Sequence, residues 1–245
     1  MNVVPYHALR VRDTEVTEFD DAVSSEDTFR IYLNEQPLAE LVASPDQLKE
    51  LGVGFVVCEG MAEDVDAVEV AGKEIRVRAS HAGVSQWTIG SCGGIGARSA
   101  PRRVVSPLTM EAQQIPKVIA ETQSELWRNT GGVHCSVLFS GSELLFKSSD
   151  VGRHNTVDKV VGSAVLNRVP LARCALGCTG RQPAGMVAKA ANAGIPIVIS
   201  KSASTYQGIL TAYMTGITLI CFARGERYTI YTHSYRVAGL VRGSE

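Results

Sequence analysis

The sequence predicts an α/β protein in which helices cover a mixed sheet, with a smaller β-containing part at the N-terminus. In the second half of the chain, short apolar runs typical of strands alternate with segments of helical spacing. In the first half, strand-like runs come in pairs that are separated by turn residues. The hydrophobic fraction of 45% over 245 residues is enough for a sizeable core without disulfides or metals.

The N-terminal part predicts a small β unit and one buried helix. Residues 28–41 alternate between apolar and polar, and a turn is predicted at 35–37. Ser44-Pro45-Asp46 combines a capping residue, a proline and an acid, which predicts that a helix starts there. Residues 65–70 and 74–78 then predict a hairpin.

The second part is more regular. Residues 109–128 have helical spacing and end at Gly131-Gly132, and residues 133–139 and 144–146 predict a hairpin. An alternation of further elements follows: helix 155–168, strand 174–178, helix 183–193, strand 195–200, helix 204–214 and strand 217–222. We place a domain boundary near residue 105, between an N-terminal β-rich part (1–105) and an α/β cofactor-binding domain (106–245).

The charge balance argues against nucleic acid and membrane surfaces as partners. Lys and Arg number 24 against 25 Asp and Glu, so the net charge of −1 does not favour binding to nucleic acid or to a membrane surface. No apolar run approaches the ~20 residues that cross a bilayer, and the N-terminus does not resemble a signal peptide. We expect a cytoplasmic protein whose six cysteines are reduced thiols.

A glycine-rich loop surrounds Cys92. The sequence GSCGGIG at 90–96 allows unusual backbone angles and a close approach of another molecule to the sulfur. The thiolate is the reactive form of cysteine, and Arg98, Arg102 or Arg103 could favour it. This pattern predicts an exchanging thiol. The alternative is that Cys92 is a small residue in a tight turn.

Three of the other cysteines are predicted to be structural. Cys58, Cys135 and Cys221 lie in apolar helix or strand patterns. Cys174 and Cys178 are four residues apart, which places them ~13 Å apart in an extended strand and prevents a bond between them. Because paired Cys-x-x-Cys motifs are missing, no metal site is predicted.

Residues 150–159 predict an anion site at the start of a helix. The free N–H groups and positive dipole end of such a helix attract phosphate, and an arginine can bind phosphate through two hydrogen bonds. The alternative is a self-capped helix start with solvated charges. The candidate cofactor-binding residues in this segment are Gly152, Arg153, His154, Asn155 and Lys159.

Two later segments have a similar character. Arg181 precedes a predicted helix and Lys201 follows a predicted strand, which is where α/β sheets bind ligands. A third segment joins two strands around a turn glycine, and by itself it is a common hairpin pattern. Its residues are Phe222, Ala223, Arg224, Gly225, Glu226 and Arg227.

These motifs together resemble the formate dehydrogenase accessory (FdhD) family. The resemblance rests on DVGRHNTVDKVVG, the upstream TGGVH, GSCGGIG, TGRQPAGMVAKAANAGIPIVISKSAST and FARGERYTIYTH, which occur in the right order over most of the chain. It implies a cytidine-deaminase-like fold without the deaminase zinc site. It also implies binding of bis(molybdopterin guanine dinucleotide) molybdenum cofactor and the transfer of sulfur from a cysteine desulfurase to that cofactor before insertion into formate dehydrogenase.

The resemblance also assigns roles to residues. Cys92 matches the first cysteine of the family's Cys-Gly-x-Cys-Gly loop and would carry the persulfide, and the segment from Phe222 to Arg227 would contact the cofactor. The expected partners are the desulfurase, the formate dehydrogenase catalytic subunit or a related molybdenum or tungsten enzyme, and a second copy in a homodimer. This chain departs from the family at Ile95, which replaces the second loop cysteine, and at Ser149, where an acid is common.

Two other functions are left open, and Ile95 is the reason for the first of them. A persulfide generally needs a second thiol or a reductant to release its sulfur, so without the second cysteine the protein could be a non-catalytic chaperone for the cofactor. A nucleotide-binding enzyme on the same scaffold is the third reading, because a fold does not fix a function. The missing zinc motif argues against this third reading.

Overall fold

A four-stranded sheet forms the N-terminal part of the protein. The computed structural model describes residues 2–82, 87–89, 95–97 and 101–241, without the side chains of 87–89 and 95–97. The sheet has the order β4-β3-β6-β5, and both hairpin predictions in this region are confirmed. Its strands are β3 (Asp27–Leu33), β4 (Gln36–Ala43), β5 (Ala67–Ala71) and β6 (Glu74–Arg78).

Helix α1 (Leu48–Cys58) begins later than the sequence predicts. Gln47 precedes it in the left-handed region, and no side chain caps its first turn. The expected capping residues have other partners: the Ser44 hydroxyl accepts a hydrogen bond from the Val151 amide, and the Asp46 carboxylate accepts one from Lys159. Tertiary contacts have therefore replaced the local cap.

The larger part is built on a six-stranded mixed sheet of order β11-β10-β12-β13-β14-β15. Strand β10 is antiparallel to both neighbours, and β12, β13 and β14 run parallel, so β11 also points the same way as these three strands. The mixed α/β class is confirmed. The strands are β10 (His134–Ser140), β11 (Glu143–Asp150), β12 (Cys174–Cys178), β13 (Ile197–Ser200), β14 (Thr218–Arg224) and β15 (Arg227–Ile230).

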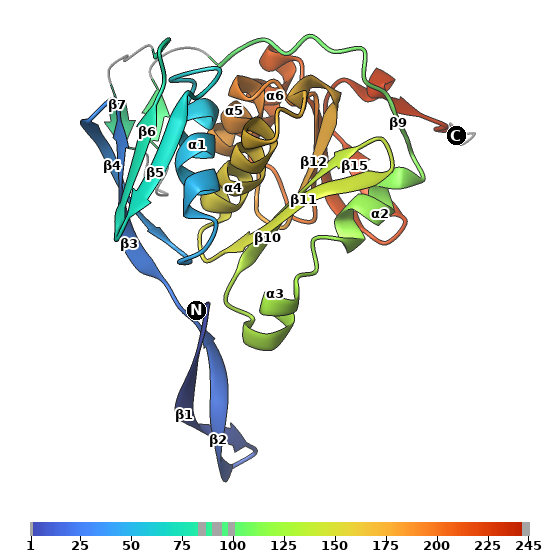
Figure 1. Cartoon of the computed structure of the whole chain (residues 1–245). Coiled ribbons are helices and arrows are strands. Elements are labelled where there is room, and N and C mark those ends of the chain that lie inside the picture. Colours follow the sequence, from blue (N-terminus) through green and yellow to red (C-terminus); the bar gives the residue numbers. More distant parts are fainter. Residues whose placement is uncertain (1, 83–86, 90–94, 98–100, 242–245) are drawn as a thin grey trace.

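Helices cover both faces of this sheet. In Figure 1, α1 and α4 (Arg153–Leu166) lie between the two sheets, while α2 (Gln114–Ala120) lies across the large sheet from α4. Buried residues of α4 and α5 (Ala184–Asn192) pack on one face in a core with Leu138, Leu176 and Val198. Helix α6 (Tyr206–Thr215) adds Ala212 to the same core.

The two large helices cross at very short distance. A Cβ atom added at Gly54 in α1 would lie 1.7 Å from the Asp158 carbonyl oxygen in α4, and one at Gly162 would lie 1.9 Å from the Glu50 carbonyl oxygen. Only glycine allows this approach. The crossing fixes α4, and thus its N-terminal residues, against the small sheet.

The prediction of one helix over residues 109–128 is wrong. The segment forms β9 (Met110–Glu111), α2 and α3 (Glu125–Thr130). The Thr122 hydroxyl donates to the Ile119 carbonyl at the end of α2, and the Ser124 hydroxyl accepts from the Trp127 amide as an N-cap. Two hydroxyl side chains therefore interrupt a continuous helical spacing.

A long hairpin at the N-terminus was not predicted. Strands β1 (Val3–Arg12) and β2 (Glu15–Ser24) project from the body of the protein in Figure 1. The remaining elements are β7 (Trp87–Ile89), β8 (Ile95–Ala97), β16 (Val237–Ala238) and the 3-10 turns Leu171–Arg173 and Ser234–Arg236. No helix in the described part of the chain is long and apolar enough to cross a membrane. The boundary near residue 105 stays a prediction.

Candidate functional site

Most of the predicted binding residues gather at one edge of the large sheet. Because β11, β12, β13 and β14 point the same way, their carboxyl ends meet at this edge. Such an edge is where α/β sheets bind ligands. Three groups of predicted residues follow β11, β12 and β13 there: Gly152 and Arg153, Gly180 and Arg181, and Lys201. The segment from Phe222 to Arg227 spans the end of β14, a turn and the start of β15.

A cavity of about 400 Å³ opens at this edge, between the sheet and α3. Its lining includes Lys201 and the last four residues of the TGGVH motif, both of which the sequence analysis singled out. Polar and basic side chains therefore face a space large enough for part of a small molecule. The lining residues are Thr122, Gln123, Trp127, Gly131, Gly132, Val133, His134, Cys135, Val151, Thr179 and Lys201.

Arg153 stands beside the cavity with an unused donor. Its side chain packs against Gly180, where an added Cβ would lie 3.0 Å from the Arg153 Cβ. The Arg153 Nε is buried and has no hydrogen-bond partner among the described residues. Nearby, the His134 Nδ1 lies 3.2 Å from the Thr179 hydroxyl, and burial together with the Arg153 charge lowers the pKa of His134. The positive charge beside this part of the cavity therefore comes from Arg153 and not from His134.

Lys201 and Trp127 form one wall of the cavity. The Lys201 Nζ lies 5.7 Å from the centre of the Trp127 ring, which is a cation–π distance. The Arg224 Nε donates to the Lys201 carbonyl oxygen at 3.4 Å, so Arg224 is held next to Lys201. Two basic residues from different predicted motifs are thus brought together.

The segment from Phe222 to Arg227 forms the end of β14, a turn and the start of β15. Phe222 has a φ of 53°, and its amide donates to the Ser202 carbonyl, which ties this turn to the loop that carries Lys201. Arg224, Gly225, Glu226 and Arg227 are exposed, but the Ala223 side chain lies in the core. Ala223 can therefore contact a ligand only through its backbone.

Arg181 is exposed at the same edge. Its side chain has no hydrogen bond or ion pair within the described part of the chain. The neighbouring Gln182 amide donates to the Ala203 carbonyl, which joins the loops after β12 and β13. Arg181 is therefore an unpaired cation, among the described residues, beside two loops that a hydrogen bond joins.

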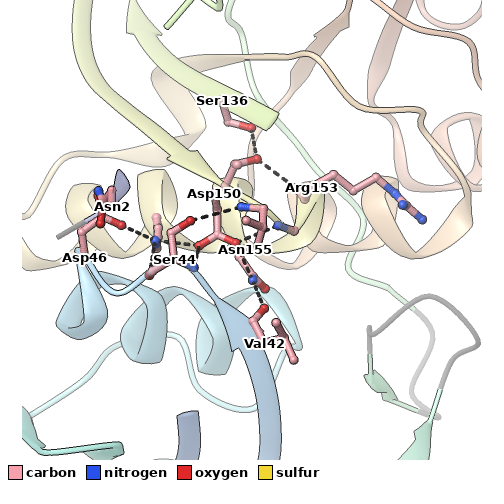
Figure 2. Close-up of polar contacts among 12 residues, drawn as sticks. Asn2, Val42, Ser44, Asp46, Ser136, Asp150, Arg153 and Asn155 are labelled. Atoms are coloured by element: carbon pink, nitrogen blue, oxygen red, sulfur yellow. Dashed lines mark hydrogen bonds and ion pairs between the residues drawn. The ribbon is translucent and has the colours of Figure 1, made fainter. Parts of the chain in front are cut away.

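Asn155 and Lys159, by contrast, point into the protein. Figure 2 shows the Asp150 carboxylate at the centre of a network, where it accepts from the Ser44 amide at 3.0 Å and from the Asn155 side chain at 2.8 Å. Lys159 is 0% exposed, and its Nζ lies 2.7 Å from both the Asp150 and the Asp46 carboxylates. The prediction that Lys159 contacts the cofactor is corrected, because its charge is satisfied internally.

The network has an indirect role at the site. The Gly152 amide donates to the Asp150 carboxylate at 2.8 Å, and the Asn155 amide group also donates to the Val42 carbonyl at 2.8 Å. These contacts fix the turn from β11 into α4, and Figure 2 shows the Arg153 side chain leaving that turn in the opposite direction. Asn155 and Lys159 are therefore positioning residues for Gly152 and Arg153.

A second buried charge cluster involves Asp158, the residue before Lys159 in α4. The Lys189 Nζ is 2.8 Å from the Asp158 carboxylate and 2.7 Å from the Glu59 carboxylate. Burial raises the pKa of Asp158 to about 6, against the opposing effect of Lys189. Burial also lowers the pKa of Lys189, but the two carboxylates outweigh it and raise that pKa overall. At neutral pH Asp158 and Lys189 therefore form an ion pair.

His154 lies in the core beside these charges and is neutral at pH 7. Burial, followed by the charges of Lys189 and Arg153, lowers its pKa to about 3. The sequence prediction treats His154 as a cofactor-binding residue. A neutral imidazole that is buried can at most donate or accept one hydrogen bond there, so it adds no positive charge to the edge.

The depressed pKa of His154 makes a prediction for acid stability. A group whose pKa is lower in the folded state contributes stability above its unfolded pKa of about 6.5, and this contribution is lost as the pH falls towards 3. The loss is about 1.4 kcal/mol per pH unit, so between pH 7 and pH 5 the wild type should lose about 2 kcal/mol more than His154→Gln. Urea unfolding of both proteins at pH 7 and pH 5 measures this difference. Equal losses of stability in the wild type and His154→Gln would contradict a buried, neutral His154.

Several residues of the cavity were missed by the residue-level reasoning, among them Trp127, His134 and Thr179. Trp127 was assigned to a continuous helix, and its position depends on the break before α3. For His134, the only signal in the sequence was its place in the TGGVH motif. Thr179 comes directly after β12 and could have been found from the rule that ligands bind at strand ends.

Cys92 lies outside the described residues, and the other five cysteines are buried free thiols. The prediction that Cys58, Cys135 and Cys221 belong to the core is confirmed. Burial raises the pKa of all five thiols, to about 11 for Cys174 and to about 12 for Cys178 and Cys221. A buried thiol that resists ionisation is a poor nucleophile.

Comparison with known proteins identifies the family. The model of the FdhD/NarQ family matches residues 24–238. The chain is 33% identical over 248 residues to sulfur carrier protein FdhD of Wolinella succinogenes, covering 93% of this chain and 87% of that protein. It is 34% identical over 218 residues to protein FdhD of Methanocaldococcus jannaschii, covering 88% and 90% of the two chains.

A solved structure agrees with these relatives. A crystal structure described as that of a formate dehydrogenase accessory protein from Desulfotalea psychrophila superimposes with a TM-score of 0.84 at 27% sequence identity. The match covers 97% of this chain and 100% of that chain. Sequence and fold thus agree along nearly the whole length, and the chain belongs to the FdhD/NarQ family.

Proposed function

We propose that the protein accepts sulfur on Cys92 as a persulfide and transfers it to the molybdenum cofactor, which binds as a substrate at the carboxyl edge of the large sheet. The observation that carries the proposal is the state of the cysteines. Five of the six thiols are buried with raised pKa values, so within a family of sulfur carriers Cys92 is the thiol that is left for the chemistry.

The loading step is a thiol exchange. The Cys92 thiolate attacks the outer sulfur of the persulfide on a cysteine desulfurase, a new S–S bond forms on Cys92, and the donor's S–S bond breaks. The donor cysteine leaves as a thiolate and takes up the proton. This step needs no oxidant or reductant.

The release step needs two electrons, and their source is an external thiol. A low-molecular-weight thiol attacks the Cys92 sulfur, forms a mixed disulfide and expels hydrosulfide towards the cofactor; a second thiol molecule then regenerates Cys92. Ile95 stands where the family has a second cysteine. The burial of the other five thiols favours an external reductant over a distant cysteine of the same chain.

The basic residues at the sheet edge suit the phosphates of the cofactor. Arg153 and Arg181 have free donors. Lys201 lines the cavity, and Arg224 is hydrogen-bonded to its carbonyl oxygen. Arginine and lysine bind phosphate through charge-assisted hydrogen bonds. The guanine dinucleotide of bis(molybdopterin guanine dinucleotide) supplies the anionic groups, so this edge is the proposed binding surface. The proposed binding surface also includes Gly225, Glu226 and Arg227.

The proposed partners follow from the two half-reactions. A cysteine desulfurase supplies the sulfur, and the catalytic subunit of formate dehydrogenase, or of a related molybdenum or tungsten enzyme, receives the charged cofactor. The similarity to a formate dehydrogenase accessory protein supports this recipient. We also propose that the protein works in the cytoplasm and pairs with itself as a homodimer.

Intact-mass spectrometry tests the loading step. After incubation with a cysteine desulfurase and cysteine, we expect the wild type to gain about one sulfur mass (~32 Da) that a reductant removes, and Cys92→Ala to gain none. Cys174→Ala is the matched control, because Cys174 is a buried thiol with a pKa of about 11, and this variant should load like the wild type. Loading of Cys92→Ala would refute the assignment.

The second candidate is a non-catalytic chaperone that binds the cofactor and delivers it to the enzyme. The observation in its favour is Ile95, which removes the nearest thiol that could resolve a Cys92 persulfide. In that case the wild type would show no reductant-labile mass gain with a competent desulfurase, although the basic edge would still bind the cofactor. The mass measurement therefore separates the two functions.

A further inference from the structure

A second hollow lies near the amino ends of the parallel strands, where α6 ends at Thr215 and β14 starts at Thr218. Its volume is about 300 Å³, and residues 103–106 form one side of it. It shares no lining residue with the cavity at the sheet edge, and no acidic residue is among the described residues that line it. Its polar and aromatic lining residues are Arg103, Ser106, Tyr213, His233, Tyr235 and Arg236.

Arg236 lines this hollow with one side of its guanidinium unused. The residue is 3% exposed, and its Nη1 donates to the Gly216 carbonyl at 2.8 Å and to the Thr218 hydroxyl at 3.2 Å. Its Nε is buried without a partner, and neither Nε nor Nη2 donates to any described residue. Nε and Nη2 form the edge with parallel N–H groups, which is the edge that binds a carboxylate or a phosphate through two hydrogen bonds.

The position of Arg236 at the end of α6 explains only part of this arrangement. The Gly216 carbonyl belongs to the negative end of the helix dipole, which favours a nearby cation and accounts for Nη1. A buried guanidinium still costs free energy while its other donors are unpaired and no carboxylate neutralises it. Arg236 forms no ion pair among the described residues. An anion in the hollow would supply the missing charge.

Arg103 adds a second cation to the same hollow. It is exposed and makes no hydrogen bond or ion pair within the described part of the chain, whereas the neighbouring Arg102 is paired with Glu63. The Val104 amide donates to the Thr215 carbonyl at 2.7 Å, which holds this segment at the end of α6. Two positive charges without acidic partners therefore face one hollow.

Aromatic side chains form the other part of the lining. The Tyr213 ring stacks on the His233 ring with 5.7 Å between centroids, and the His233 ring meets the Tyr235 ring edge-on at 5.8 Å. His233 has a φ of 48°, which is uncommon for a residue other than glycine, and its Nε2 donates to the Tyr213 carbonyl at 3.0 Å. Tyr213 is 67% exposed and Tyr235 68%. Exposed rings that are held in place offer faces on which a flat ring can stack.

We propose that this hollow binds a small phosphate ester that carries a flat aromatic ring, of the size of a nucleoside monophosphate. The phosphate lies between Arg103 and Arg236, whose two charges match those of a phosphate monoester, and the ring packs on the tyrosines. A volume at the lower end of the range of ligand pockets, ~300–1,000 Å³, suits one nucleotide. The site is separate from the sheet edge, so this inference does not rest on the proposed sulfur transfer.

Calorimetric titration with AMP tests the proposal, because AMP combines a flat ring with a phosphate and lacks the guanine diphosphate of the cofactor. Adenosine and inorganic phosphate should each bind at least ~10-fold more weakly than AMP, since each lacks one of the two parts. Arg103→Gln removes a charge-assisted hydrogen bond and should raise the Kd for AMP roughly 10-fold. Arg102→Gln is the matched control: it changes the net charge equally, but Arg102 does not line the hollow, so the Kd should stay the same.

Arg236→Lys tests the buried side of the site. Lysine keeps the positive charge but lacks the planar pair of donors, so the Kd for AMP should again rise about 10-fold or more. Circular dichroism checks that this variant is folded, and Arg103→Gln decides the question if it is not. A wild type that does not bind AMP at millimolar concentration would overturn the proposal, and so would equal affinities for AMP and phosphate.

A further variant checks that AMP binds in this hollow and not at the sheet edge. Lys201→Gln/Arg224→Gln removes two cations of that edge and should bind AMP like the wild type. If this double variant loses AMP while Arg103→Gln binds it normally, the ligand occupies the sheet edge and the proposal is wrong. The measurement involves no sulfur, so its failure would leave the sulfur-carrier function unaffected.

Discussion

Lys159→Met is expected to lower the free energy of unfolding by about 3–5 kcal/mol, because it breaks a fully buried ion pair and leaves a carboxylate without its counter-charge. The Lys159 Nζ lies 2.7 Å from the Asp150 carboxylate, and both side chains are 0% exposed. The methionine keeps most of the side-chain volume, so the loss measures charge rather than a cavity. Urea unfolding at pH 7 gives the difference.

The control is an ion pair of nearly the same length at the surface. The Lys73 Nζ lies 2.6 Å from the Asp27 carboxylate, with both side chains largely exposed. Water and salt screen this pair, so Lys73→Met should leave the unfolding midpoint almost unchanged. A loss for Lys159→Met no larger than that for Lys73→Met would contradict the prediction, because the buried Asp150 carboxylate would then not depend on Lys159 for its stability.

The second carboxylate partner of Lys159 shows where prediction from the sequence stops. The string RHNTVDK correctly predicts a helix start after a strand, because that prediction depends on neighbours in the sequence. The role of Lys159 depends instead on Asp46, which is 113 residues away and belongs to the turn before α1. No local pattern shows that this turn, rather than a ligand, neutralises the lysine.

The predicted strands and helices are likewise correct where they depend on local patterns and wrong where they do not. Strands with clear alternation, such as β3 and β6, are confirmed within two residues because their periodicity is local. The helix predicted over 109–128 is wrong because two hydroxyl groups end one helix and start the next within four residues. The N-terminal hairpin has exposed apolar residues on both faces, including Tyr6 and Leu9, so it lacks the one-sided pattern on which strand prediction depends.

The edge where the candidate site lies could be inferred from the order of strands and helices. Polar residues after successive parallel strands meet at one edge, and Arg153, Arg181 and Lys201 do so. The cavity itself could not be inferred, because one wall is Trp127 on a helix that the sequence pattern joined to another. The conformation around Cys92 lies outside the described residues, so its role stays a proposal that rests on sequence and family.

Sulfur loading and cofactor binding should be separable by mutation in both directions. We expect Cys92→Ala to lose the persulfide and to activate co-expressed formate dehydrogenase at least ~100-fold less than the wild type, while its affinity for GDP is unchanged. GDP serves as the probe because it reproduces the nucleotide diphosphate of the cofactor. The double variant Lys201→Gln/Arg224→Gln should do the reverse: each lost charge-assisted hydrogen bond costs about 1.5–3 kcal/mol, which is at least ~10-fold in Kd per residue.

Arg173→Gln is the control for the double variant, because Arg173 is exposed at the opposite end of β12 and its loss changes the net charge in the same direction. Calorimetric titration with GDP and intact-mass analysis are run on every variant. If Cys92→Ala still activates the enzyme fully, Ile95 marks the loss of sulfur chemistry and the protein acts as a cofactor chaperone. If the double variant binds GDP like the wild type, the phosphates are held elsewhere, and the pairing of Lys201 with Arg224 serves only to tie the loops after β13 and β14 together.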